Sequence, residues 1–518
     1  MTPTEKAAGL LIVRLGNNLP PARTADEQAD DVARLLGEYP VGGLILFNGR
    51  WPETRATLAR LQTHSAAGLL VTTDMERGFG QQAPGATVYP HAGAFARLPD
   101  PDAEAAVREM AAQSSREALA AGVHVTYSPV ADVDRNPRNP IIGARAYGPD
   151  AERAGRLVAA FVAGVHDAGQ IATAKHFPGH GGTSEDSHAT TPTVTDSREV
   201  LDATDLVPFR AAVAAGVDAV MTAHVAVPAL DPSGLIATRS APILRGLLRG
   251  EMGFEGVVVS DSLQMAGAKE AGRTEADLAA DLLAAGVDLF VDAVDPRALI
   301  EGLGRAVEGE RLDEALLDAA LARVQRLRDR LAARFGAGVF RDPSLAYPTS
   351  VVGLPEHAAL AERVAGAALD LARGPLPTDL GDGAGVLFVA FRRPPLPIEP
   401  PAMALGAAVR GAFPAATYRE ILPAPHTPDA DLDAVLELGR QSRRVVLAPV
   451  IRPSAWHAFG LGEREQRLAD ALTDAAPTTL LLLGDRRGLA GFPRADSALV
   501  AHSDVAASQR ALVARLRS

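Results

Sequence analysis

Along roughly the first 300 residues, short apolar runs alternate with longer stretches in which apolar positions recur at helical spacing. Eight units of a strand followed by a helix in this length predict a (β/α)₈ barrel, and a doubly wound open sheet is the competing topology. The expected strands are Gly9–Leu15, Gly43–Phe47, Leu69–Asp74, Val123–Val130, Ile171–Phe177, Ala219–Val225, Gly256–Asp261 and Leu289–Ala293. The helical stretches include Thr24–Glu38, Pro52–Ala66, Asp102–Ala121, Ala151–Ala168, Ser197–Ala215 and Thr274–Ala285.

The pattern changes near Phe335, where the last barrel helix is expected to end. A stretch rich in Gly and Pro follows, and the alternation then resumes. We therefore predict an α/β protein with a TIM-like barrel over residues 1–340, a linker over 341–355 and a smaller α/β sandwich domain over 356–518. The expected strands of the second domain are Gly385–Phe391, Arg444–Val450, Thr478–Gly484 and Ala498–His502, and its helices are His357–Arg373, Asp429–Gln441, Glu463–Ala475 and Ala507–Arg517.

Composition narrows the class of partner. A formal net charge of -12 argues against nucleic acid and anionic membrane as partners. Cysteine is absent, which excludes disulfides and thiolate metal sites. The N-terminus lacks a clear signal peptide, and no stretch approaches the roughly 20 apolar residues that span a bilayer. We therefore expect a cytoplasmic protein.

Ionisable residues gather where the expected strands end, and the carboxyl ends of the strands are where a (β/α)₈ barrel forms its active site. Any single member of this set can instead be a helix cap or a satisfied core residue. Asp261, taken alone, suits the cap of the next helix as well as it suits a nucleophile. The set comprises Asp74 and Glu76 after the third strand, Arg145 in the loop after the fourth, Lys175 and His176 at the fifth, His224 at the sixth, Asp261 at the seventh and Asp292 at the eighth.

The segment from Lys175 to His188 carries the densest chemistry. Pro178 and the glycines around it predict a loop rather than a helix. Asp186 and His188 stand two positions apart, so that the carboxylate can hold the imidazole in one tautomer and raise its basicity, as a general acid/base pair requires. The histidines also admit a metal site or a purely structural loop, but a metal needs ligands held rigidly together. We favour the acid/base pair, with no metal and no cofactor.

Four motifs, in this order, resemble glycoside hydrolase family three, and within it the bacterial β-N-acetylglucosaminidases (β-N-acetylhexosaminidases). Two departures lie beside the expected sugar-binding residues. Arg77 follows Glu76 where the family commonly has Glu-Gly-Gly, and Ala144 precedes Arg145 where a polar residue is usual. The motifs are TDMERG at Thr73–Gly78, NPIIGARAYG at Asn139–Gly148, KHFPGHG at Lys175–Gly181 with Asp186–His188, and VSDSLQM at Val259–Met265.

The resemblance implies a retaining, exo-acting glycosidase. Asp261 would be the nucleophile that forms a covalent glycosyl-enzyme, and His188, oriented by Asp186, would be the general acid/base. Many relatives place a Glu from the second domain in that role, whereas the Asp-x-His pair marks the N-acetylglucosaminidase branch. The residues implied to bind the hydroxyls of the terminal sugar are Asp74, Arg145, Lys175 and His176.

Other functions remain open. Within the family, the chain can be a β-glucosidase, a β-xylosidase or a glycoside phosphorylase, since a histidine acid/base repels phosphate less than a carboxylate would. Outside it stand a non-catalytic carbohydrate-binding protein on the same fold and a metal-dependent barrel hydrolase. If the enzyme acts on N-acetylglucosaminyl-anhydromuramyl material, the resemblance implies a role in cell-wall recycling.

Overall fold

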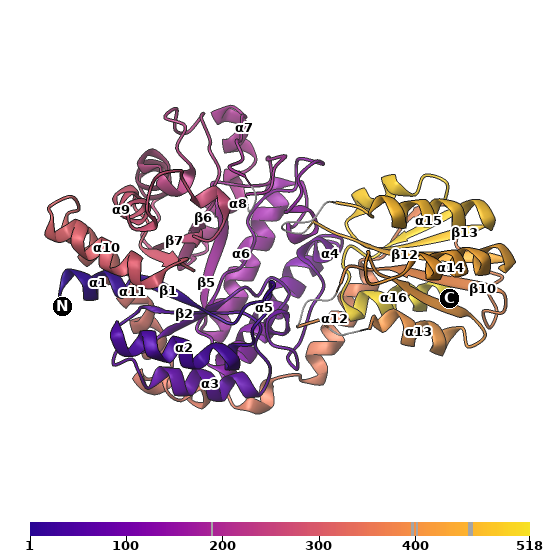
Figure 1. Ribbon diagram of the computed structural model, residues 1–518, viewed down its shortest axis with the longest axis horizontal. Coiled ribbons are helices and arrows are strands. Elements are labelled where there is room, and N and C mark those ends of the chain that lie inside the picture. Colours follow the sequence, from indigo (N-terminus) through magenta and orange to yellow (C-terminus); the bar gives the residue numbers. More distant parts are fainter. Residues whose placement is uncertain (188–189, 395–397, 400–401, 454–458) are drawn as a thin grey trace. The chain divides into compact units, whose positions relative to one another are not determined.

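The computed structural model describes residues 1–187, 190–394, 398–399, 402–453 and 459–518. They form two compact units, which Figure 1 colours along the sequence. The first unit comprises Met1–Val88, Glu104–Asn139 and Ala146–His357, and the second comprises Tyr89–Ala103, Pro140–Arg145 and Ala358–Ser518.

Eight parallel strands close into a barrel in the first unit, in the order β1 to β8, and β8 pairs with β1. The predicted (β/α)₈ barrel is thereby confirmed, and the open sheet is excluded. Most strand positions are buried, because one face points into the barrel and the other against helices. The strands are β1 (Leu11–Leu15), β2 (Gly43–Leu46), β3 (Leu70–Thr73), β4 (Val125–Thr126), β5 (Ile171–Phe177), β6 (Ala219–Thr222), β7 (Val257–Ser262) and β8 (Leu289–Val291).

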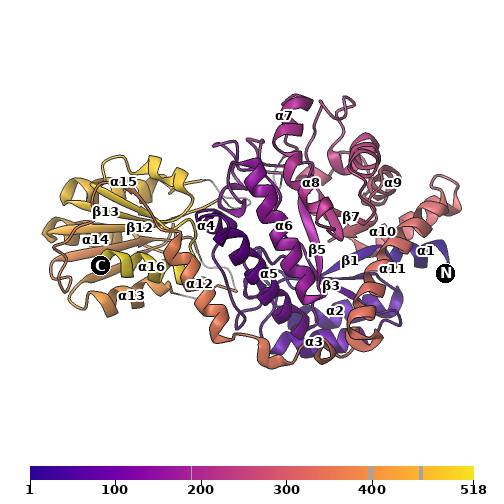
Figure 2. The same cartoon turned by 180° about the vertical axis from the view of Figure 1, so that it is seen from behind.

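Helices surround these strands, as both ribbon views show (Figures 1 and 2). Local chemistry sets several of their ends. Thr24, for example, accepts from the backbone of Glu27 while the Glu27 carboxylate accepts from the backbone of Thr24, a capping box at the start of its helix. The helices of the first unit include α1 (Pro3–Ala8), α2 (Ala25–Glu38), α3 (Glu53–Gln62), α5 (Asp102–Ala121), α6 (Ala151–Ala168), α7 (Arg198–Ala203), α8 (Leu206–Ala214), a π-helical segment Pro242–Glu251, α9 (Glu275–Ala285), α10 (Pro296–Glu308) and α11 (Glu314–Phe335). The next helix, α12 (Pro355–Ala367), begins in the first unit and lies mostly in the second.

Two predictions for the barrel segments are wrong in detail. The expected strand Val123–Val130 is regular only over Val125–Thr126, with an isolated bridge from Val130 to Lys175, and Pro129 has no N–H to continue a ladder between them. The single helix expected over Ser197–Ala215 is two helices, α7 and α8. They part at Asp205, whose side chain turns inward to accept from Arg135 Nε at 2.8 Å.

The second unit contains a six-stranded sheet in the order β11-β10-β12-β13-β14-β9. Only β9 runs antiparallel to its neighbour. Two buried apolar clusters lie on opposite faces of the sheet, one under α14 and α15 and the other under α13 and α16, so the predicted α/β sandwich is confirmed. The elements are β9 (Asp370–Arg373), β10 (Val386–Phe391), α13 (Ala404–Ala412), β11 (Thr417–Ile421), α14 (Asp429–Gln441), β12 (Arg444–Ile451), α15 (Glu463–Ala475), β13 (Thr478–Gly484), β14 (Ser497–Val500) and α16 (Ala506–Arg517), with a short α4 (Ala92–Phe95) from the barrel half of the sequence.

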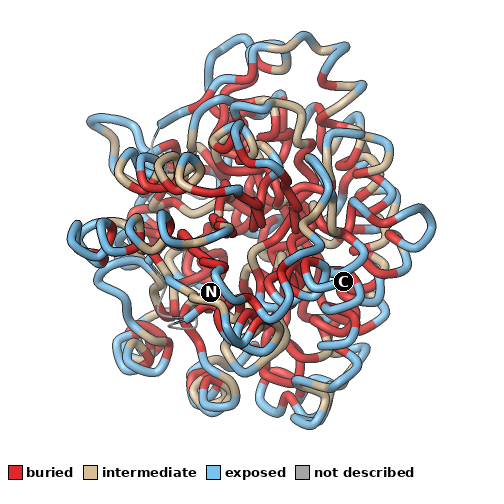
Figure 3. Tube along the Cα trace, turned by 90° about the vertical axis from the view of Figure 1, so that its right-hand side faces the viewer, coloured by how far each residue is buried: buried red, intermediate tan, exposed pale blue. Residues whose placement is uncertain are grey.

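Some elements of the second unit differ from those predicted. The helix expected over His357–Arg373 is replaced by α12, which ends at Ala367, and by the strand β9. Neither β11 nor α13 was predicted. Buried positions follow the strands and the inner faces of the helices (Figure 3). Among the helices of the described residues, none is both long enough and apolar enough to span a bilayer.

Candidate active site

Lys175 lies between two carboxylates at the C-terminal end of the barrel. Its Nζ is 2.6 Å from Asp74 Oδ1 and 3.0 Å from Glu76 Oε1. Asp74 follows β3 directly, and Lys175 lies on β5, so the two strands that flank β4 bring them together. The Lys175 side chain is only 4% exposed, and a buried cation of this kind is tolerated because its charge is paired. Three members of the set found in the sequence, Asp74, Glu76 and Lys175, thus contact one another, and the part of Asp74 and Lys175 in sugar binding stays a prediction.

His176 is held by Asp132, a residue that the sequence analysis missed. His176 Nδ1 lies 2.7 Å from Asp132 Oδ2, and the backbone N–H of His180 donates to Asp132 Oδ1 at 2.6 Å. Burial acts to raise the pKa of Asp132, but the contacts with His176 and His180 outweigh it and lower that pKa below its usual range. The carboxylate is therefore ionised at neutral pH, and with Nδ1 directed at it, Nε2 is the ring nitrogen left for a ligand.

The loop after β5 rests on the loop after β4. Asn139 Nδ2 donates to the carbonyl of His180 at 2.9 Å, and Asn136 Nδ2 donates to the carbonyl of Thr183 at 2.9 Å. A Cβ at Gly181 would overlap the carbonyl oxygen of Val133, so this close approach requires glycine. The segment is not helical, as predicted, and its backbone is fixed by these contacts.

Asp261 lies near the end of β7, where the Ser262 backbone N–H donates to Asp261 Oδ1 at 2.7 Å. It does not cap the next helix, because the N-cap of α9 is Thr274. Burial raises the pKa of the Tyr127 phenol, and Asp74, Asp292 and Asp261 raise it further. Three carboxylates, from the ends of β3, β7 and β8, therefore lie within electrostatic reach of one phenol.

The far end of the loop after β5 contacts the loop after β7. Ser187 Oγ lies 2.8 Å from His180 Nε2, and the Ser187 carbonyl accepts from the Gly267 N–H at 3.2 Å. Asp186, the preceding residue, accepts from the Thr190 N–H at 3.0 Å through its carbonyl. His188 lies outside the described residues. The predicted pairing of Asp186 with His188 stays a prediction.

Two other predicted residues have different surroundings. Arg145 belongs to the second unit, where its Nη1 donates to the Ile141 carbonyl at 3.0 Å, and its part in sugar binding stays a prediction. His224 lies 3.0 Å from Thr238 Oγ1 through Nδ1 and 3.2 Å from the Ser262 carbonyl through Nε2. Its ring thus braces the end of β7.

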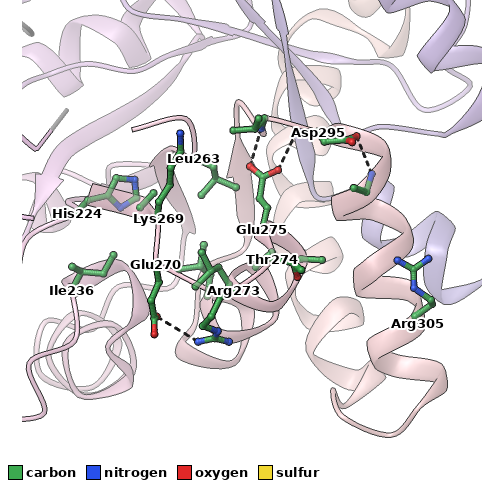
Figure 4. A pocket seen from close by; sticks show the side chains of 17 residues that line it. His224, Ile236, Leu263, Lys269, Glu270, Arg273, Thr274, Glu275, Asp295 and Arg305 are labelled. Atoms are coloured by element: carbon green, nitrogen blue, oxygen red, sulfur yellow. Dashed lines mark hydrogen bonds and ion pairs between the residues drawn. The ribbon is translucent and has the colours of Figure 1, made fainter. Parts of the chain in front are cut away.

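A cavity of about 520 Å³ lies beside the loop after β7, between α9 and α10 (Figure 4). Apolar side chains such as Leu263 and Leu278 line it, and its rim carries charges. Glu275 is fixed there by the backbone N–H groups of Val294 at 2.8 Å and Asp295 at 3.1 Å. Leu263, near the end of β7, and His224 line it, whereas Asp74, Lys175 and Asp261 are not among its described lining residues.

Within the described residues, no group of three or more metal-ligating side chains is placed to hold an ion. His176 is directed at Asp132, and His180 Nδ1 lies 2.8 Å from Thr183 Oγ1. The described histidines of this segment are therefore engaged with protein partners.

Protonation of His180 is expected to destabilise the protein. Burial lowers the pKa of His180 to about 4, against the raising effect of Asp132. The unfolded chain, with a pKa of about 6.5, then binds more protons than the folded protein between pH 4 and 6.5, so stability is full above this window and falls as pH falls through it. At pH 5 the loss from this residue is about 2 kcal/mol relative to pH 8.

Urea unfolding of the wild type and of His180→Gln at pH 8 and pH 5 measures this loss. The variant is expected to show a pH dependence smaller by about 2 kcal/mol, since glutamine does not titrate. His64→Gln, at an exposed histidine, is the control and should leave the pH dependence unchanged. An equal pH dependence in all three proteins contradicts the prediction.

Known proteins were compared with this chain. A model of the glycosyl hydrolase family 3 N-terminal domain matches residues 2–327. A β-N-acetylglucosaminidase/β-glucosidase from Cellulomonas fimi is 33% identical over 346 residues, which cover 64% of this chain and 59% of that protein. A β-hexosaminidase from Pseudomonas aeruginosa is 39% identical over 265 residues, which cover 49% of this chain and 76% of that protein.

A solved structure extends the likeness to the second unit. The glycoside hydrolase family 3 β-N-acetylglucosaminidase from Paenibacillus sp. is 30% identical with a TM-score of 0.86, covering 100% of this chain and 97% of that chain. The match to the Cellulomonas fimi protein, by contrast, spans only about three fifths of that protein's length. Since the family model covers more than half of the sequence, the chain belongs to glycosyl hydrolase family 3.

Proposed function

We propose that this chain is a retaining β-N-acetylglucosaminidase that removes terminal β-linked N-acetylglucosamine by hydrolysis of the glycosidic bond. The relatives named for this activity support the sugar. One contact carries the proposal for the site: the Ser187 carbonyl accepts from the Gly267 N–H. It joins the loop after β5, which contains Asp186, to the loop after β7, the strand that carries Asp261.

The mechanism assigns one role to each side chain. Ionised Asp261 attacks the anomeric carbon, and the bond to the leaving oxygen breaks as His188 gives it a proton. In the second step His188 takes a proton from water, which attacks the same carbon and releases Asp261. Two inversions retain the configuration. A histidine with a pKa of about 6.5 suits both duties, because each protonation state is accessible near neutral pH.

The remaining polar groups suit the hydroxyls of the sugar. Lys175 donates and Asp74 accepts, and hydroxyls do both. His176, fixed through Nδ1 by Asp132, offers Nε2. Arg145 joins this set by resemblance alone. A cytoplasmic location and a role in cell-wall recycling belong to the same proposal and rest on that resemblance.

A panel of aryl glycosides tests the function. The nitrophenyl N-acetylglucosaminide is expected to give a kcat/KM at least about tenfold above that of the nitrophenyl glucoside or xyloside, since one well-placed polar contact is worth this much. NMR of the first product should show the β-anomer. The reverse preference favours a β-glucosidase or β-xylosidase, sugar 1-phosphate formed with added phosphate favours a phosphorylase, and no turnover favours a binding protein.

The same panel examines the acid/base. In His188→Ala, glycosides with poor leaving groups should lose activity, whereas a dinitrophenyl glycoside, which needs no proton to depart, should still form the covalent intermediate. Asp186→Asn should behave in the same way but less severely. Equal losses for good and poor leaving groups contradict the role of His188. Loss of activity on treatment with a chelator would favour the metal-dependent alternative.

A further inference from the structure

An ion pair joins the two strands that close the barrel. Arg14 lies on β1, and Asp292 directly follows β8, the strand that pairs with β1. Arg14 Nε donates to Asp292 Oδ1 at 2.7 Å, and Arg14 Nη2 donates to Oδ2. The Asp292 side chain is 1% exposed and that of Arg14 is 22% exposed, so the pair is largely removed from solvent. A two-point contact of this kind fixes direction as well as distance.

Asp292 also binds the end of β7. Ser262 Oγ donates to Asp292 Oδ2 at 2.7 Å, and Gln264 Nε2 donates to Oδ1 at 2.9 Å. Each carboxylate oxygen therefore accepts one hydrogen bond from Arg14 and one from the β7 end. The backbone of Asp292 has a φ of +63°, a left-handed conformation that is unfavourable for most residues and is maintained by its surroundings.

Ser262 connects this network to Asp261. Its side chain donates to Asp292, while its backbone N–H donates to Asp261 Oδ1 at 2.7 Å. A shift of Asp292 would move Ser262, and with it the donor that orients the Asp261 carboxylate. The His224 ring, 3.2 Å from the Ser262 carbonyl, braces the same residue from β6.

We propose that Arg14 and Asp292 are positioning residues for the reaction. The pair holds Ser262 so that its backbone amide orients Asp261, and the Arg14 guanidinium neutralises the charge of the Asp292 carboxylate. The inference rests on the proposed role of Asp261 as the nucleophile. Without Arg14, the buried Asp292 carboxylate would keep an uncompensated negative charge that is linked to Asp261 through Ser262, and the ionised form of the nucleophile would be disfavoured.

The charges that face Asp261 support this role for Arg14. Within the described residues, the Tyr127 phenol lies in reach of Asp261, Asp74 and Asp292, and His180 in reach of Asp261. Tyr127 is buried with a raised pKa and His180 has a lowered one, so neither carries charge at neutral pH. Lys175 is engaged with Asp74 and Glu76. Arg14, by contrast, pairs with Asp292, the carboxylate that is linked to Asp261 through Ser262.

Removing the charge of Arg14 and removing the charge of Asp292 should shift the pH profile in opposite directions, which a merely structural role would not do. Arg14→Gln should lower kcat by about 10- to 100-fold with KM within about threefold, because the nucleophile is displaced while sugar binding persists. It should also move the acidic limb of kcat/KM up by about 1 pH unit. Asp292→Asn leaves the Arg14 charge unpaired and should move the limb down. The double variant should return the limb to its wild-type position while kcat stays low.

Ser262→Ala serves as the second line of test if a charge variant fails to fold. It removes the hydroxyl from Asp292 but changes no charge, so kcat should fall by about tenfold and the acidic limb should not move. Arg297→Gln is the matched control, since Arg297 forms a similar two-point contact with Glu38 on the exposed surface. Its kinetics should equal those of the wild type.

The outcomes are distinct. Opposite limb shifts in the single variants, cancelled in the double variant, support the inference, as does the Ser262→Ala result. Unchanged limbs with kcat losses that follow the loss of folded protein, or unchanged kcat, overturn it. Full activity in Asp261→Asn instead overturns the proposed function, whatever Arg14 does.

Discussion

Asp261→Asn is expected to lower kcat/KM for an aryl β-N-acetylglucosaminide by roughly 10⁴-fold, because the amide cannot attack the anomeric carbon. The change keeps the shape of the side chain. The Ser262 N–H, now 2.7 Å from the Asp261 carboxylate, can still donate to the amide oxygen, so the fold and the binding of substrate should be retained. Steady-state kinetics, with thermal unfolding to check the fold, measure the effect.

A matched change and a chemical rescue make the result specific. Asp295→Asn removes a carboxylate from the same end of the barrel at the N-cap of α10, where asparagine caps equally well, and should leave the kinetics unchanged. In Asp261→Gly, added azide should enter the vacated space and form the α-glycosyl azide, the product of a single inversion. Near wild-type turnover by Asp261→Asn would remove that residue from the role of nucleophile.

The sequence was most informative where strands are buried on both faces. All seven residues of β5 are buried, and this run was predicted with its observed bounds. The edge strands β9 and β11 were missed, because most of their positions are partly exposed and they present no continuous apolar run. β9, which reads Asp-Leu-Ala-Arg, was instead taken as the end of the preceding helix.

Nothing in the local sequence of Tyr89–Ala103 indicates that this segment belongs to the second unit. Its grouping depends on contacts between residues far apart in sequence, such as His91 Nδ1 with Ser503 Oγ at 2.9 Å. Composition and periodicity describe neighbours along the chain, and they carry no information on such pairs.

In the candidate site, too, residues at the ends of predicted strands were found, and residues that depend on distant partners were missed. Asp74, Lys175 and Asp261 were found because a parallel barrel brings the ends of its strands together. Arg14, inside the expected strand Gly9–Leu15, was not among the predicted site residues, since its partner Asp292 is 278 positions away. Asp132 lies six residues beyond the last residue of β4, where the strand-end rule no longer points to it.

Asp132 nevertheless holds together more of the site than any residue predicted for that loop. It is 1% exposed, and it accepts from the His176 ring and from the backbone N–H groups of His176 at 3.3 Å and His180 at 2.6 Å. Because the residue is buried, bulk solvent does not reach these donors. The orientation of a predicted sugar-binding histidine and the course of the loop that leads to Asp186 therefore depend on one carboxylate.

Asp132→Ala is therefore expected to lower the free energy of unfolding by about 3–5 kcal/mol, because it leaves several buried donors without an acceptor. It should also lower kcat/KM by about 100-fold or more, since His176 and the loop after it lose their alignment. Asp132→Asn keeps one acceptor oxygen but not the charge, so its stability and its kcat/KM should fall between those of the wild type and those of Asp132→Ala. Urea unfolding and aryl-glycoside kinetics measure both effects. Asp30→Asn is the control: Asp30 is an exposed carboxylate paired with Arg60 on the barrel surface, and this change should alter neither the stability nor the kinetics. An Asp132→Ala protein as stable and active as this control would contradict the prediction and show that the buried donors find other partners.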